Sequence, residues 1–118
     1  MGWQDYPSAP APGTVICAAD DVTGVHALTV ATGKGDFPIL VARSGNGFCA
    51  YVNACPHQYL PLDYRGRQLQ SADGTMILCT NHGARFDLAT GVAVDGADCG
   101  LDRVPVECAA GVIRIAVE

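Results

Sequence analysis

Turn-forming residues divide this 118-residue chain into short segments, and this division restricts its fold more than any other feature. Glycine, asparagine and aspartate recur roughly every ten residues, and the runs between them are rich in β-branched and aromatic side chains. The chain has 14 glycines, which are costly inside helices, and no stretch keeps a helical apolar period over three turns. The pattern predicts an all-β domain, built as a small antiparallel sandwich or barrel.

Nine of the runs are expected to form strands, and one pair of them predicts a tight hairpin. The runs 37–42 and 48–52 flank the sequence Ser44-Gly45-Asn46-Gly47, which is a strong hairpin signal. Residues 55–71 are the least strand-like stretch, and a loop of this length inside a small domain is usually functional. The expected strands are residues 14–18, 25–30, 37–42, 48–52, 76–78, 85–88, 92–94, 104–107 and 112–117.

Composition and charge exclude several classes of protein. Hydrophobic residues make up 49% of the chain and charged residues 16%, so the chain is expected to fold. The net charge is −5 and no Lys/Arg cluster is present, which argues against a nucleic-acid partner. No run approaches the roughly 18 apolar residues of a membrane span. Residues 1–13 form an expected flexible, proline-rich leader without the features of a secretory signal. We expect a cytoplasmic protein with no membrane partner and one domain over residues 14–118.

Six cysteines leave two uses open. In an exported chain they would indicate three disulfides, whereas in a reducing compartment they indicate metal binding or catalysis. Two of them stand close to histidines, in Cys55-Pro56-His57 and in Cys79-Thr80-Asn81-His82. Each of these two arms offers one thiolate and one imidazole, and the chain has only three histidines in all. The spacing therefore favours a shared metal site.

Two plainer interpretations of these pairs stand beside the metal site. A free cysteine is commonly a small buried apolar residue, so either pair alone would fit a structural role. Two thiolates and two imidazoles would also suit a structural zinc ion. Zinc modules, however, usually pair Cys with Cys and His with His along the chain. Arms that each carry one Cys and one His better fit a site in which the two cysteines come together from different loops, and the two histidines do the same.

The segments CPHQYLPLDYRG and CTNHGARFDLATG resemble the Rieske-type [2Fe–2S] proteins, whose pattern is C-x-H, a linking segment and C-x2-H. The resemblance implies a Rieske-like fold with a cluster-binding subdomain of two loops, at about residues 53–101. It also implies that Cys55 and Cys79 bind one iron and that His57 and His82 bind the other. The link between the pairs is a few residues longer than in many ferredoxins of the family, and we expect the extra length near 65–67.

The same resemblance indicates where the reduction potential falls. Two ferric ions, two sulfides and two thiolates carry no net charge, so this cluster is easier to reduce than one held by four thiolates. High-potential members place Ser and Tyr after the second pair, where their hydroxyls donate to sulfur, but Ala84 and Phe86 stand there in this chain. Those members also join the loops by a disulfide, at positions that match Leu60 and Asn81. We expect a potential near the low end, about −150 mV, as in the ferredoxins of bacterial aromatic-ring dioxygenases.

The remaining candidate residues have less distinctive patterns. His26 lies in a strand pattern and is expected to be a partly exposed sheet residue. Cys99 lies in the segment 96–100, which matches the third, cluster-covering loop of the family but lacks its usual proline. The residue could be structural or lie beside the iron. Leu60, Pro61 and Leu62 would shield the cluster or simply pack the loop. The other cysteines, expected to be packed thiols, are Cys17, Cys49 and Cys108.

These observations predict a one-electron carrier that passes electrons from a flavin-dependent reductase to a terminal oxygenase, without substrate turnover of its own. Both partners are implied by the resemblance. One alternative is a ferredoxin-like subunit of a larger Rieske oxygenase or reductase complex, and another is the structural Cys2His2 zinc module. Once His57 and His82 are assigned, only His26 remains, so the chain alone cannot build the 2-His-1-carboxylate iron site of an oxygenase.

Overall fold

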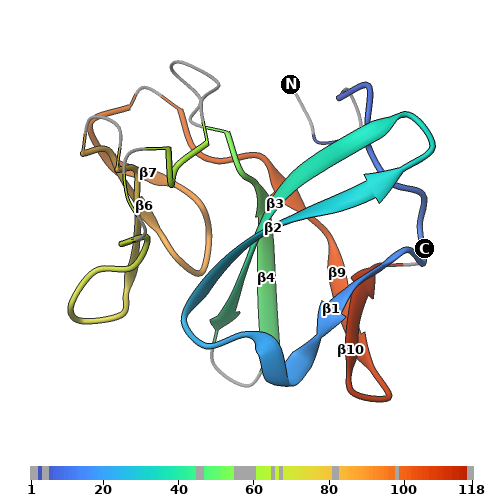
Figure 1. Cartoon of the computed structure of the whole chain (residues 1–118). Helices are drawn as coiled ribbons and strands as arrows, with labels where there is room; N and C mark the ends of the chain where they lie inside the picture. The colour runs from blue at the N-terminus through green and yellow to red at the C-terminus, as the bar shows by residue number, and fades with distance from the viewer. Residues whose placement is uncertain are drawn as a thin grey trace.

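Ten short strands in three antiparallel sheets make up the regular structure of the described part of the chain (Figure 1). The computed structural model describes residues 3, 6–44, 47–54, 61–64, 66, 68–80, 83–97 and 99–116. A short 3-10 turn, η2, spans Ala19–Asp21. The strands are β1 (Val15–Ala18), β2 (Val25–Thr32), β3 (Gly35–Ser44), β4 (Gly47–Val52), β5 (Met76–Leu78), β6 (Arg85–Asp87), β7 (Ala93–Asp95), β8 (Arg103–Val104), β9 (Val106–Ala109) and β10 (Val112–Ile115).

The middle sheet has the order β2-β3-β4-β8 and carries the longest strands. A second sheet, β1-β10-β9, joins the two ends of the chain. The third sheet, β5-β6-β7, is built from strands of three residues each and stands apart from the other two, with β6 and β7 on the left of Figure 1. All pairings are antiparallel, so the all-β antiparallel fold expected from the turn pattern is confirmed.

Alternating side chains of β3 and β4 serve two separate hydrophobic cores. Successive residues of a strand point to opposite faces of a sheet. Leu40 of β3 and Tyr51 of β4 belong to the core that β5 and β6 share, whereas Ile39 and Val52 belong to the core that β10 shares. Four consecutive residues of β3, 39–42, are therefore all buried. The middle sheet thus lies between the two cores, and the predicted ligand Cys79 belongs to the core that β5 and β6 share.

The strand boundaries follow the sequence prediction closely, with one informative difference. Ser44 pairs with Gly47 at the predicted hairpin, while Gly45 and Asn46 lie outside the described residues. The run 104–107 is not one strand, because the chain leaves the middle sheet at Pro105 and enters the β1-β10-β9 sheet. Proline has no backbone N–H to donate to a ladder, so it is suited to this transfer between sheets.

Part of the proline-rich segment that precedes β1 contacts the middle sheet. The rings of Trp3 and Tyr6 pack edge-on against Phe37, with centroid distances of 6.4 and 6.0 Å. The hydroxyl of Tyr6 donates to Oδ2 of Asp102 at 3.1 Å. Gly13 donates its backbone N–H to the carbonyl of Ile115, next to the pairing of β1 with β10. The division of the chain into residues 1–13 and 14–118 stays a prediction.

No helix among the described residues has the length and apolar character to cross a membrane.

Candidate metal centre

Of the four predicted ligands, the structure describes Cys79. This residue follows β5 directly and is 1% exposed, within a core cluster that also contains Leu62, Ala84 and Phe86. The other three predicted ligands, Cys55, His57 and His82, lie outside the described residues. The structure therefore defines the surroundings of one predicted ligand and the segments that flank the other three.

Backbone hydrogen bonds fix the turn that begins at Cys79. Its N–H donates to the carbonyl of Ala84 at 2.8 Å, and its own carbonyl accepts from the N–H of Gly83 at 3.0 Å. Gly83 has a φ of 78°, which is unfavourable for residues with a Cβ atom. The two bonds continue the pairing of β5 with β6 and hold Cys79 against Gly83 and Ala84, the residues that follow the C-x2-H segment.

The sulfur of Cys79 differs from that of its neighbour Cys49. Both cysteines are buried in the same core cluster. The thiol of Cys49 donates to the carbonyl of Leu88 at 3.2 Å, and desolvation by burial is the main reason that its pKa is raised. Cys79 is a free cysteine, and its sulfur makes no hydrogen bond to any described residue. A buried sulfur without a hydrogen-bond partner among the described residues fits a thiolate that binds iron.

Asn53 connects the end of β4 to the far side of the loop that Cys55 opens. Its side chain is buried, with 6% exposed, and no other polar or charged residue of the described part is buried to this degree. Its Oδ1 accepts from the N–H of Leu62 at 2.7 Å, and its Nδ2 donates to Oδ1 of Asp63 at 3.1 Å. Asn53 belongs to neither of the two Cys/His motifs. The only local signal is a polar residue at the end of a buried strand.

Thr80 makes the matching contact from the second arm. Its N–H and its hydroxyl both donate to the carbonyl of Leu62, at 2.8 and 2.6 Å. Leu62 is fully buried, whereas Pro61 is exposed. Leu62 is thus the member of the predicted shield 60–62 that packs into the core with Cys79, and Leu60 lies outside the described residues.

Gly96, in the segment that matches the third loop of the family, packs against Ala84, just beyond the second Cys/His pair. Gly96 has a φ of 79°, and a methyl group there would lie 2.7 Å from Cα of Ala84. Ala84 and Phe86, the two positions without hydroxyls, are both fully buried. Cys99 is exposed. The close approach of Gly96 to Ala84 places this segment against the turn that carries Cys79.

The remaining sequence-predicted residues differ in how far they are buried. His26 is partly exposed on β2, as expected, and lines an open groove of about 440 Å³ with Asp63 and Leu69. Cys17 is half-buried, as a packed thiol should be. Cys108 is exposed, so its prediction as a packed thiol was wrong. It lies on β9, an edge strand, next to the turn into β10, where few residues cover it.

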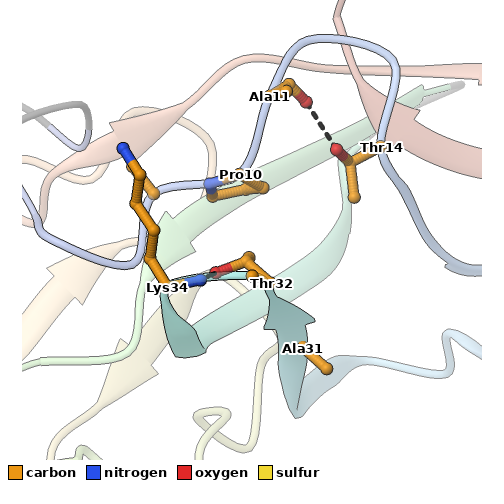
Figure 2. Close-up of a pocket in the computed structure, with 8 residues that line it drawn as sticks. Pro10, Ala11, Thr14, Ala31, Thr32 and Lys34 are labelled. Carbon is orange, nitrogen blue, oxygen red and sulfur yellow. Dashed lines mark hydrogen bonds between the residues drawn. The ribbon is translucent and has the colours of Figure 1, made fainter.

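A second pocket lies far from the candidate metal centre. It has a volume of about 500 Å³ between the proline-rich segment and the tip of the β2–β3 hairpin, on the opposite side of the molecule from β6 and β7 (Figures 1 and 2). Figure 2 shows Thr14 donating to the carbonyl of Ala11, and Lys34 extending along one side. The hydroxyls of Thr14 and Thr32 both bond to nearby backbone carbonyls. The described residues that line this pocket include no His, Cys, Asp or Glu.

Comparisons with known proteins agree with this arrangement. No curated protein sequence matches the chain. Three solved structures resemble it over nearly their whole length. A chain from the complex of reduced oxygenase and oxidized ferredoxin in carbazole 1,9a-dioxygenase is 27% identical, with 86% of this chain and 99% of that chain covered and a TM-score of 0.67. The Sphingomonas yanoikuyae B1 ferredoxin is 24% identical, with 90% and 99% covered and a TM-score of 0.70. The ferredoxin of carbazole 1,9a-dioxygenase from Nocardioides aromaticivorans IC177 is 21% identical, with 92% and 100% covered and a TM-score of 0.67.

The model of the Rieske [2Fe-2S] domain matches residues 13–105. This range contains both Cys/His pairs, the linking segment between them and the segment that packs on Ala84. Because the match spans most of the sequence and all three segments of the candidate metal centre, the chain belongs to the Rieske [2Fe-2S] domain family.

Proposed function

We propose that this protein is a one-electron carrier whose [2Fe–2S] cluster is held by Cys55, His57, Cys79 and His82. It receives electrons from a flavin-dependent reductase and passes them to a terminal oxygenase. The family binds a [2Fe–2S] cluster, and the chain resembles ferredoxins of dioxygenase systems along almost their entire length. The observation that carries the proposal is the Rieske match over a range that contains both Cys/His pairs.

The buried surroundings of Cys79 suit this role. The cluster supplies the chemistry, which is the gain and loss of one electron. The chain contributes a dry apolar wall, in which Leu62, Ala84 and Phe86 are fully buried in one core cluster with Cys79. Excluding water and hydroxyl donors from the sulfur side of a cluster lowers its potential. The proposed potential is therefore near the low end of the histidine-ligated range, at about −150 mV.

Aerobic purification followed by redox titration with EPR tests the proposal. We expect a brown protein with two irons and two sulfides per chain and a paramagnetic reduced state. A colourless protein that contains zinc would contradict it. A protein that holds the cluster but purifies only with a large oxygenase chain would instead favour the alternative of a subunit in a larger complex.

Ala84→Ser is expected to raise the midpoint potential. A hydroxyl that donates to a cluster sulfur favours the reduced state, and about 1 kcal/mol of added stabilisation corresponds to roughly 40 mV for one electron. Redox titration of the two proteins measures the shift. Ala50→Ser is the matched control, because Ala50 is equally buried but belongs to the other core cluster. It should cost stability and leave the potential unchanged. Equal potentials in Ala84→Ser and wild type would contradict the assignment of Ala84 to the cluster environment.

Electron transfer to a basic acceptor should slow as salt is added. The chain carries a net charge of −5, so it attracts a positively charged partner at low ionic strength. Stopped-flow mixing of the reduced protein with oxidised cytochrome c, a basic one-electron acceptor, should give a rate that falls roughly tenfold between low and high salt. With ferricyanide, an anion, the rate should rise with salt instead. Electron-transfer rates that do not change with ionic strength for either acceptor would argue against electrostatic steering.

A further inference from the structure

We propose that Asn53 and Thr80 are positioning residues that hold the two ligand-bearing loops together through the peptide groups of Leu62. The inference rests on the proposed function, because the loops in question are those that carry the four proposed ligands. Asn53 stands two residues before Cys55, and Thr80 directly follows Cys79. Each of them contacts Leu62, which lies on the return of the first loop and carries no ligand itself.

The main chain of Leu62 is bound on both sides. Its N–H donates to Oδ1 of Asn53 at 2.7 Å, and its carbonyl accepts from the N–H and the hydroxyl of Thr80 at 2.8 and 2.6 Å. A carbonyl oxygen has two lone pairs, so both donors of Thr80 can be accepted at once. The three bonds form one bridge from the end of β4, through Leu62, to the turn that begins at Cys79.

Burial makes this bridge specific. Leu62 is fully buried and Asn53 is 6% exposed, so water cannot readily replace the bond between them. A buried N–H that loses its partner carries the full cost of desolvation. The second amide contact of Asn53, from Nδ2 to Asp63, fixes which way its side chain faces. The bridge therefore favours one relative placement of the two loops, as a preorganised metal site requires.

Thr80→Val and Thr80→Ser form a matched pair of variants. Valine has nearly the same shape as threonine but lacks the hydroxyl, whereas serine keeps it. We expect Thr80→Val to lose its cluster about fivefold faster than wild type, which is the effect of one lost hydrogen bond, and Thr80→Ser to stay within about twofold. The loss is followed as bleaching of the visible absorbance in the presence of an iron chelator. The EPR g values of the reduced protein should change in Thr80→Val and stay at the wild-type values in Thr80→Ser.

Asn53→Ala tests the other half of the bridge without relying on the cluster. Hydrogen exchange measured by mass spectrometry on the protein as purified should show the peptide that contains Leu62 exchanging about tenfold faster or more. Ile113→Val is the control for general destabilisation, because Ile113 is fully buried in the other core cluster. It should lower stability but leave the rate of cluster loss, the EPR g values and the exchange at Leu62 at their wild-type values.

The outcomes separate the two claims. If the wild-type protein holds no iron and sulfide, the proposed function fails, and the exchange at Leu62 still decides whether the bridge exists. If wild type holds the cluster and Thr80→Val has the same cluster lifetime and g values, the positioning role is overturned and the proposed function stands. The role is also overturned if Ile113→Val speeds cluster loss as much as Thr80→Val does, since the effect would then follow stability rather than loop placement.

Discussion

Cys79→Ala is expected to purify as a colourless protein with less than about a tenth of the wild-type iron and sulfide. Removing one of the four proposed ligands leaves three, and the core cluster around position 79 is formed mostly by apolar side chains. Because cluster binding stabilises only the folded state, the variant should also unfold at a lower temperature. Iron and sulfide analysis, with the visible spectrum, measures the effect.

Cys49→Ala is the matched control for this variant. Cys49 is 2% exposed and lies in the same core cluster as Cys79, so both substitutions remove a buried sulfur. The Cys49 sulfur, however, faces the carbonyl of Leu88 at 3.2 Å. Its loss should cost about 1 to 2 kcal/mol of stability and leave the cluster content unchanged. If both variants kept the cluster, Cys79 would not be a ligand. If both lost it, the effect of Cys79→Ala would be one of folding.

The strands were predictable because the signal for each is local. Alternating side chains and turn residues specify the bounds of β2, β3 and β4 to within a few residues. Because side chains alternate along β3, its two faces pack into two different cores. Pro105 was a local signal that the run 104–107 is interrupted, but the sheets that its two halves join depend on pairing partners distant in the sequence, so the change of sheet was missed. Cys108 was misjudged for a related reason, because an edge position depends on strand order.

For the candidate metal centre too, local features were predictable and contacts between distant residues were not. The spacing of the Cys/His pairs pointed to a shared metal site, and the family resemblance gave the four ligands, which stay a prediction because three of them lie outside the described residues. The bridge through Leu62 was not visible, since its partners are nine and 18 residues away from Leu62 and meet only after folding. An asparagine at a strand end and a threonine after a cysteine are unremarkable in sequence. Their role depends on the buried main chain of Leu62, which both of them contact.

Gly96→Ala is expected to be among the most destabilising substitutions of a single small residue in this chain. Its φ of 79° is unfavourable for alanine, at about 1 kcal/mol, and the new methyl group would lie 2.7 Å from Cα of Ala84. Backbone cannot move aside as a flexible side chain can, so the overlap adds a further cost, and we expect a total loss of about 3 kcal/mol. Urea unfolding of the holoprotein measures it.

Gly111→Ala separates the two causes. Gly111 has a φ of 81°, nearly that of Gly96, but a methyl group there would meet nothing within 4 Å. It should therefore lose only about 1 kcal/mol, the cost of the backbone conformation alone. Since Ala84 accepts the backbone hydrogen bond of Cys79, displacing the 96–100 segment should also speed cluster loss in Gly96→Ala but not in Gly111→Ala. Equal losses of stability and equal cluster lifetimes in the two variants would show that the contact between Gly96 and Ala84 does not hold this segment against the metal centre.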